Sequence, residues 1–462
     1  MIKRLLLFAT LLFTAAGMYA QTSLEGKITE EETGAVAELA TVKLFKGGVL
    51  ITGAQTDFDG FFSISPVDPG TYTIEASYVG FTTKQVEGVI VKQGKANVVN
   101  IKLSKGVVMN EVEIVAYKVP LIEQDNTTQG SVVTAEQIRN LPQRNVNAIA
   151  ASTAGVSTSG ESGSITIRGS RSTNTVYWLD GMPVSGNFVP VWDLEQLQVI
   201  TGGLGAEYGD ATGGVISGST KGPSQKFSGG VEAETSALFD KYGYNLLNIN
   251  LSGPILRKKD TKESILGYRL SGSYTGYKDD NPSAVGIYTA NQAAIDRVAA
   301  DPITRIGENF LVQTGELLTN KNGDVDLVKV RPNEESNRID LNGKLDWRIN
   351  KKIDVSLNGT YSRDYNKFSP GNTWWLLNAQ NNPEAFANTS RFNFRFRHRL
   401  GNANISEGED AKAQLSAFRN ASYTLQFFYQ NGTNLSYDSR FKDNFFDYGH
   451  VAEFDFGYRG AI

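Results

Sequence analysis

Long runs of alternating apolar and polar residues fill the chain from Phe227 onward. The clearest run places Ile339, Leu341, Gly343, Leu345, Trp347 and Ile349 between Arg338, Asp340, Asn342, Lys344, Asp346 and Arg348. A period of two predicts β-strands. The face that carries these charged residues can neither lie in the core of a soluble sandwich nor contact lipid. The pattern therefore favours strands with apolar side chains toward lipid and polar ones toward a wet lumen.

The same alternation recurs at residues 353–361, and shorter runs surround Leu247, Leu266, Phe392 and Leu425. Between residues 278 and 335 a long polar insert, helical around residues 291–300, is expected as an extracellular loop. About seven to nine strands fit before the chain ends. We therefore expect residues 227–462 to form the first part of an antiparallel transmembrane β-barrel, left incomplete here.

Residues 22–104 carry shorter alternating runs, at 40–44, 61–64 and 72–76. Turn-forming Asp, Pro and Gly residues separate these runs. This spacing predicts a small β-sandwich.

Residues 130–223 mix helical and strand signals. Thr134 and Gln137 make a capping box that opens a helix over residues 135–140, and a second helical piece is expected around residues 146–151. Strands are predicted at residues 164–168, 175–179 and 197–200, with a turn at Asp180 and Gly181. The segment is predicted to be a small α+β domain, so the chain as a whole is mainly β.

The intervening residues 105–129 read as a linker with one alternating stretch, which comprises Glu111, Val112, Glu113, Ile114, Val115, Ala116 and Tyr117. Two interpretations stay open for it. The stretch could pair with the exposed sheet edge of a partner through main-chain hydrogen bonds, or it is an ordinary edge strand or unpaired linker.

The first twenty residues predict a secretory signal peptide, with Lys3 and Arg4 at its start, an apolar run, and small residues up to Ala20. Cysteine is absent and the two histidines, His398 and His450, lie far apart. We therefore expect no catalytic residues, no metal site, no cofactor and no enzymatic activity. The net charge of −4, with both signs mixed, gives no basic stripe for nucleic acid.

Two segments resemble known domain families. The stretch through "TDFDGFFSI" and "PGTYTIEASYVGF" resembles the carboxypeptidase-regulatory-like domain, a transthyretin-like sandwich. Four later motifs, "SVVTAEQIRNLP", "AGVSTSGESGSITIRGS", "TNTVYWLDGMPV" and "LEQLQVITGGLGAEYGDATGGVISGSTKG", are similar to the plug of TonB-dependent outer-membrane transporters in their order and spacing.

The resemblance implies a location in the outer membrane, with the N-terminal domain in the periplasm. It implies TonB, with its inner-membrane energising complex, as a partner, together with outer-membrane lipid and an unknown imported ligand. A surface lipoprotein is a further candidate partner. Residues 111–117 stand where the family's TonB box belongs. The glycine-rich plug run is closer to Oar-like members, so adhesion or export is the alternative to import.

Within the plug, the notable residues are Arg168, Gly169, Asp180, Gly181, Glu207, Tyr208 and Gly209. Arg168 lies in an apolar strand, so we expect it to be a buried charge paired with Asp180 or Glu207, an exposed arginine being the alternative. The glycines suit positive φ or close packing.

Overall fold

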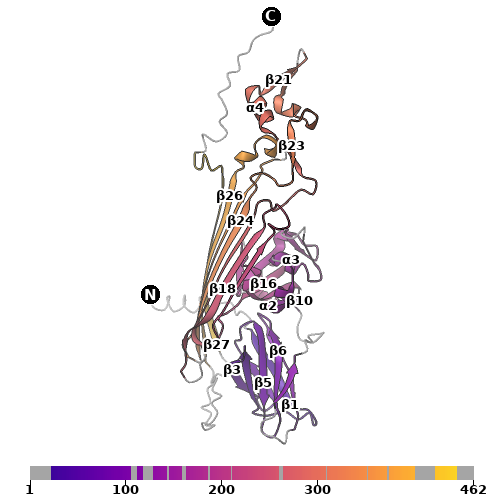
Figure 1. Ribbon diagram of the computed structural model, residues 1–462. Coiled ribbons are helices and arrows are strands. Elements are labelled where there is room, and N and C mark those ends of the chain that lie inside the picture. The colour runs from indigo at the N-terminus through magenta and orange to yellow at the C-terminus, as the bar shows by residue number, and fades with distance from the viewer. Residues whose placement is uncertain are drawn as a thin grey trace, which may run out of the picture.

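The computed structural model describes residues 22–444, apart from 106–111, 118–127, 143–144, 159–162, 186–187, 210, 260–263, 308–309, 351, 372–373 and 401–421. The predicted signal peptide and Glu111 lie outside the described residues. A sandwich, a plug and a tall open sheet follow one another along the chain, and a small lobe lies at the far end of the sheet (Figure 1). Among the described residues, no helix is long and apolar enough to span a membrane.

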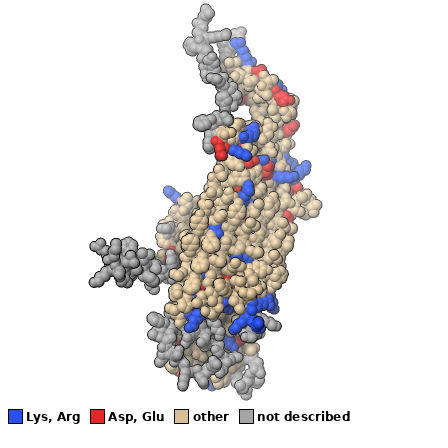
Figure 2. All heavy atoms as spheres, turned by 90° about the vertical axis from the view of Figure 1, so that its left-hand side faces the viewer, with Lys and Arg blue, Asp and Glu red and all other residues tan. Residues whose placement is uncertain are grey.

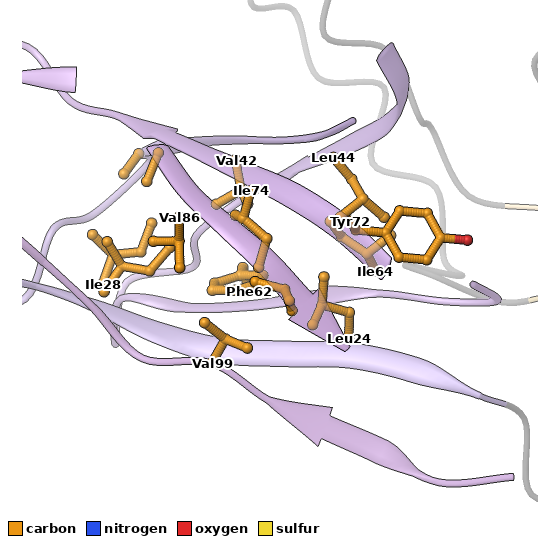
Figure 3. Packing of buried hydrophobic residues seen from close by; sticks show 14 of the residues in the cluster. Leu24, Ile28, Val42, Leu44, Phe62, Ile64, Tyr72, Ile74, Val86 and Val99 are labelled. Atoms are coloured by element: carbon orange, nitrogen blue, oxygen red, sulfur yellow. The ribbon is translucent and has the colours of Figure 1, made fainter. Parts of the chain in front are cut away.

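The N-terminal sandwich has two sheets. β1 (Ser23–Glu30) pairs with β4 (Phe61–Ile64), β7 (Ala96–Val98) and β8 (Ile101–Leu103). The second sheet has the order β3 (Val49–Gln55), β2 (Thr41–Lys46), β5 (Gly70–Ser77), β6 (Thr83–Val91) and β9 (Val112–Ala116). Leu24, Phe62 and Ile74 fill the space between the sheets and are at most 1% exposed (Figure 3). The alternation of short runs therefore predicted the sandwich correctly.

The plug is an α+β unit. Its sheet has the order β10 (Gln129–Thr134), β15 (Leu194–Gly202), β16 (Gly214–Thr220), β13 (Thr175–Leu179) and β14 (Met182–Val184). Helices α2 (Ala135–Asn140) and α3 (Val146–Ala150) and the hairpin of β11 (Val156–Thr158) and β12 (Ile165–Ile167) complete it. The predicted capping box of Thr134 and Gln137 is present at the start of α2. The side chains of Ile149, Ile167 and Leu197 are fully buried in its core.

The C-terminal sheet, which we call the barrel wall, is antiparallel throughout. Its order is β17 (Ser228–Thr235), β18 (Asn245–Arg257), β19 (Ser264–Tyr277), β24 (Ser336–Arg348), β25 (Ile353–Lys367), β26 (Glu384–Arg399) and β27 (Ser422–Tyr437). Among the described residues β17 and β27 each have one neighbour only, so the barrel is incomplete and not closed. Each strand pairs with its predecessor in this list, in the meander expected of such a barrel.

The two faces of the barrel wall differ as the alternation predicted. On β24, Leu341 is 52% exposed whereas the adjacent Asn342 is 6% exposed. The outer face carries few charged side chains over its middle part, and the charges gather toward its two ends (Figure 2). The plug lies against the inner face, which is why the polar residues there are the buried ones (Figure 1).

The insert between β19 and β24 forms the lobe. It contains β20 (Ile287–Ala290), α4 (Gln292–Ala300), β21 (Ile303–Ile306), β22 (Phe310–Gln313) and β23 (Val325–Val328). The predicted helix is therefore present, with Asn291 as its N-cap.

Candidate coupling strand and plug contacts

The predicted turn at Asp180 and Gly181 joins β13 to β14. Both residues have positive φ, 50° and 84°, as the two-residue hairpin loop requires. The Asp180 carboxylate accepts hydrogen bonds from the N–H and the hydroxyl of Thr220, each at 2.8 Å, and from Nδ2 of Asn358 at 3.2 Å. Thr220 ends plug strand β16, and Asn358 lies on β25. Asp180 therefore joins its hairpin to both the plug sheet and the barrel wall.

The expectation of a buried, paired Arg168 was wrong. Arg168 follows β12 with a φ of 51°, and its side chain is exposed. Its guanidinium donates to Oε1 of Gln129 and not to Asp180 or Glu207. The strand ends at Ile167, so the chain turns at Arg168 and carries the side chain out of the core. The alternative of an exposed arginine is the one the structure shows.

Gly169 and Gly209 behave differently. Gly169 has a φ of 73°, in the left-handed region that glycine adopts at no steric cost. Gly209 has a φ of −50°, and a Cβ there would meet the oxygen of Ala206 at an ordinary 3.8 Å. The expectation that Gly209 needs positive φ or close packing was therefore wrong, because the chain continues there in a right-handed turn.

Glu207 and Tyr208 lie in the 3-10 turn Ala206–Tyr208. Tyr208 is 7% exposed, and its ring meets Trp178 edge-on with the centroids 5.0 Å apart. Burial raises the pKa of Tyr208 to about 12, and the nearby Glu207 adds to the effect. Tyr208 therefore stays neutral and packs the glycine-rich loop onto β13.

The buried ion pair of the plug was missed at the sequence level. Asp193, 1% exposed, accepts from Nη2 of Arg269 at 3.1 Å and from the hydroxyl of Ser271 at 2.6 Å. Arg269 and Ser271 lie on β19, on the inner face of the barrel wall. A lone Asp within the apolar segment that precedes β15 was the available signal, but nothing in the sequence identified its partner 76 residues away.

Further polar contacts join plug and barrel wall. Arg338 donates to the carbonyl of Phe188 at 2.7 Å, and Arg391 donates to the carbonyl of Ser185 at 2.8 Å. Lys344 donates to the hydroxyl of Thr220 at 3.1 Å. This interface thus relies on hydrogen bonds and charges, which exchange with water more readily than a packed apolar core would.

The stretch predicted as a coupling segment forms strand β9, an edge strand of the sandwich. Residues 112–116 pair in parallel with residues 83–87 of β6. The N–H of Tyr117 donates to the carbonyl of Glu87 at 2.7 Å, and Nζ of Lys84 lies 3.1 Å from a carboxylate oxygen of Glu113. The structure thus shows the edge strand that was one of the two interpretations left open, and it adds that the sheet is that of the chain's own sandwich.

The other edge of β9 faces no strand of the described residues, because β9 ends the five-stranded order. The N–H of Tyr117 points toward β6. Since N–H groups of successive residues point to opposite sides of a strand and Ile114 precedes Tyr117 by three residues, the N–H of Ile114 points to the open edge. The side chains of Ile114 and Val112 are 62% and 45% exposed. An apolar strand with an open edge is a template for pairing with a strand of another chain.

Comparison with known families agrees with this architecture. Residues 23–104 match the carboxypeptidase regulatory-like domain, and residues 123–215 match the TonB-dependent receptor plug domain. The chain therefore carries these two domains in the order found here, with the strands of an incomplete barrel after them.

Curated relatives are named as TonB-dependent proteins. The chain is 31% identical over 181 residues to the probable TonB-dependent siderophore receptor PirA of Acinetobacter baumannii. This alignment covers 33% of this chain and 23% of that protein. It is 25% identical over 245 residues to the TonB-dependent transporter Oar of Myxococcus xanthus, in an alignment that covers 49% of this chain and 23% of that protein. The chain thus spans less than a quarter of the length of either relative.

Among solved structures, the siderophore receptor PirA from Pseudomonas aeruginosa overlaps 66% of this chain and 41% of its own length. The sequence identity is 20% and the TM-score is 0.39, so this overlap is too loose to add to the domain matches.

Proposed function

We propose that this chain belongs to an outer-membrane receptor that imports a ligand and takes its energy from TonB through strand β9. The observation that carries the proposal is the open edge of β9, with its outward N–H groups and exposed Ile114, directly upstream of a plug domain. A strand of TonB would add to this edge by main-chain hydrogen bonds. Such pairing depends on backbone shape, so it tolerates variation in side chains.

The outer-membrane setting is supported by the barrel wall and by the match to the TonB-dependent receptor plug domain. An apolar outer face needs lipid, whereas the inner face needs the plug or water. The sandwich lies beside the plug at the end of the barrel wall opposite the lobe (Figure 1), and this separation supports a periplasmic sandwich with an extracellular lobe.

Photo-crosslinking tests the coupling site without knowledge of the ligand. A photoreactive amino acid replaces Ile114 in the complete protein in cells, and crosslinked TonB is detected by antibody. The control position is Phe58, which is also exposed (71%) and lies on a turn of the same sandwich. We expect a TonB adduct from position 114 and none from position 58. Equal adducts, or none from position 114, would remove β9 as the coupling site.

The ligand is a separate question. Because one relative is named a siderophore receptor, a ferric siderophore is the first class to test, with iron-labelled ferric enterobactin as the probe. The match to Oar keeps export or adhesion as the second candidate function. Accumulation of the probe in cells that have TonB, and not in cells without it, would support import and not export or adhesion.

A further inference from the structure

The sandwich contacts the plug through its own polar side chains. Oε1 of Gln93, in the turn between β6 and β7, accepts from the hydroxyl of Ser219 at 2.9 Å and from that of Ser217 at 3.3 Å. Both serines lie on β16 and are at most 5% exposed. Nζ of Lys46, at the end of β2, lies 3.1 Å from a carboxylate oxygen of Glu195 on β15. Two strands of the plug sheet are thus held by the sandwich.

The sandwich also contacts the barrel wall. Asp68, in the loop between β4 and β5, lies 2.7 Å from Nη2 of Arg397 and 3.3 Å from Nη2 of Arg395, both on β26. Partial burial alone would raise the pKa of Asp68, whose side chain is 45% exposed, but the two arginines hold it well below its usual range. The carboxylate is therefore charged at neutral pH and faces two positive groups.

Charged and apolar residues both line this junction. A cavity of about 140 Å³ lies there, and the charged part of its lining comes from the wall and the loop: Asp68, Asp346, Arg348, Asp354, Arg395, Arg397 and Arg399. Apolar residues, among them Ile51, Val67 and Trp347, line the rest. Such a space holds water readily. Separation of the sandwich from the barrel wall would expose the paired charges of Asp68, Arg395 and Arg397, which water solvates, together with part of the apolar lining.

We propose that the sandwich is a latch that fastens the plug to the barrel wall and must open before the plug can move. The same folded domain holds the plug at Gln93 and Lys46 and the barrel wall at Asp68. Any displacement of the plug relative to the wall must therefore break one of these two sets of contacts. The apolar core of the sandwich keeps the distance between the two sets fixed.

The latch also lies between the coupling strand and the plug. β9 belongs to the same sheet as β2, which carries Lys46. If TonB pulls on β9, as in the proposed function on which this step rests, the force acts on the sandwich, because β9 is paired with β6. The ion pairs and hydrogen bonds of the latch then come under load.

The accessibility of Ser219 reports on the latch. Ser219→Cys is introduced into the complete protein, and its rate of labelling by a maleimide is measured in outer-membrane preparations without TonB. The 462 residues contain no cysteine, so they contribute no other labelled site. We expect slow labelling in the docked state. Asp68→Asn should raise the rate about three- to tenfold, since a half-exposed ion pair contributes modestly. Ser217→Cys serves as a second reporter.

Asp59→Asn is the matched control, because Asp59 is an exposed carboxylate in a turn of the same sandwich. It should leave the labelling rate unchanged. Rapid labelling of both reporters without Asp68→Asn, or equal effects of Asp68→Asn and Asp59→Asn, would overturn the latch.

Energised cells supply the second measurement. Labelling of Ser219→Cys should rise when TonB is present and fall to the basal rate when TonB is deleted. If a crosslink from position 114 to TonB forms but labelling does not rise, the latch is refuted while the coupling site stands. If docking protects Ser219 but no crosslink forms, the coupling site fails and the docked contact remains.

Discussion

An arginine placed at the middle of β24 tests whether the outer face of the barrel wall lies in lipid. The 13 residues of β24 rise about 3.3 Å each, and a tilt of about 40° makes them span about 30 Å, the thickness of a bilayer's hydrocarbon core. Leu341 lies near the middle of this strand and Ile349 just beyond its end. Both side chains point outward, at 52% and 43% exposure.

The expected magnitudes differ because water is near one site and far from the other. Leu341→Arg should lower the free energy of unfolding by about 2–4 kcal/mol, whereas Ile349→Arg should lower it by about 0–1 kcal/mol. The difference of about 2–3 kcal/mol corresponds to roughly 30- to 150-fold in the ratio of folded to unfolded protein. Leu345→Arg, between the two, should give an intermediate value.

The assay is a urea titration of the complete protein refolded into phospholipid vesicles. The folded fraction is read from the difference in electrophoretic mobility between unheated and boiled samples. The same three variants in detergent micelles, whose thickness adapts, should differ less. Equal destabilisation by Leu341→Arg and Ile349→Arg in vesicles would refute the assignment of this face to lipid.

Three further outcomes follow from named contacts. Asp193→Ala leaves Arg269 buried without its counter-charge, so plug stability measured by limited proteolysis should fall by about 3–5 kcal/mol, and a loss below about 1 kcal/mol would contradict the buried pair. Ile114→Pro removes an N–H from the open edge of β9, so the TonB crosslink from a photoreactive group at position 112 should vanish. Glu113→Ala should retain this crosslink. A crosslink that persists in the proline variant would assign coupling to another segment. The pKa of Asp68 is lower when the sandwich is docked, so its ion pairs stabilise the docked state above the usual carboxyl range and are lost only as the pH falls through the pKa of the docked state. Protection of Ser219→Cys should therefore hold from about pH 7 to about pH 5 and weaken only in stronger acid.

The sequence by itself determined the local elements. The helix that begins after Thr134 formed where its capping box placed it, because a cap needs only residues within one turn. The turn at Asp180 and Gly181 formed for the same reason. Alternation on β24 correctly separated Leu341 from Asn342, since side chains of a strand point to opposite faces whatever lies beyond them.

Only the tertiary structure decided which residues meet. Alternation assigned Asn342 to a wet lumen, but the plug fills that space and leaves the side chain 6% exposed. The sequence singled out Arg168, which turned out to be exposed, and passed over Asp193, whose partner comes from a distant strand of the barrel wall. β9 pairs with the sandwich because one edge of β6 is open to it. The residues of β6 and β9 do not by themselves predict this pairing. Pairing across long stretches of chain depends on how the domains pack, and no local pattern encodes it.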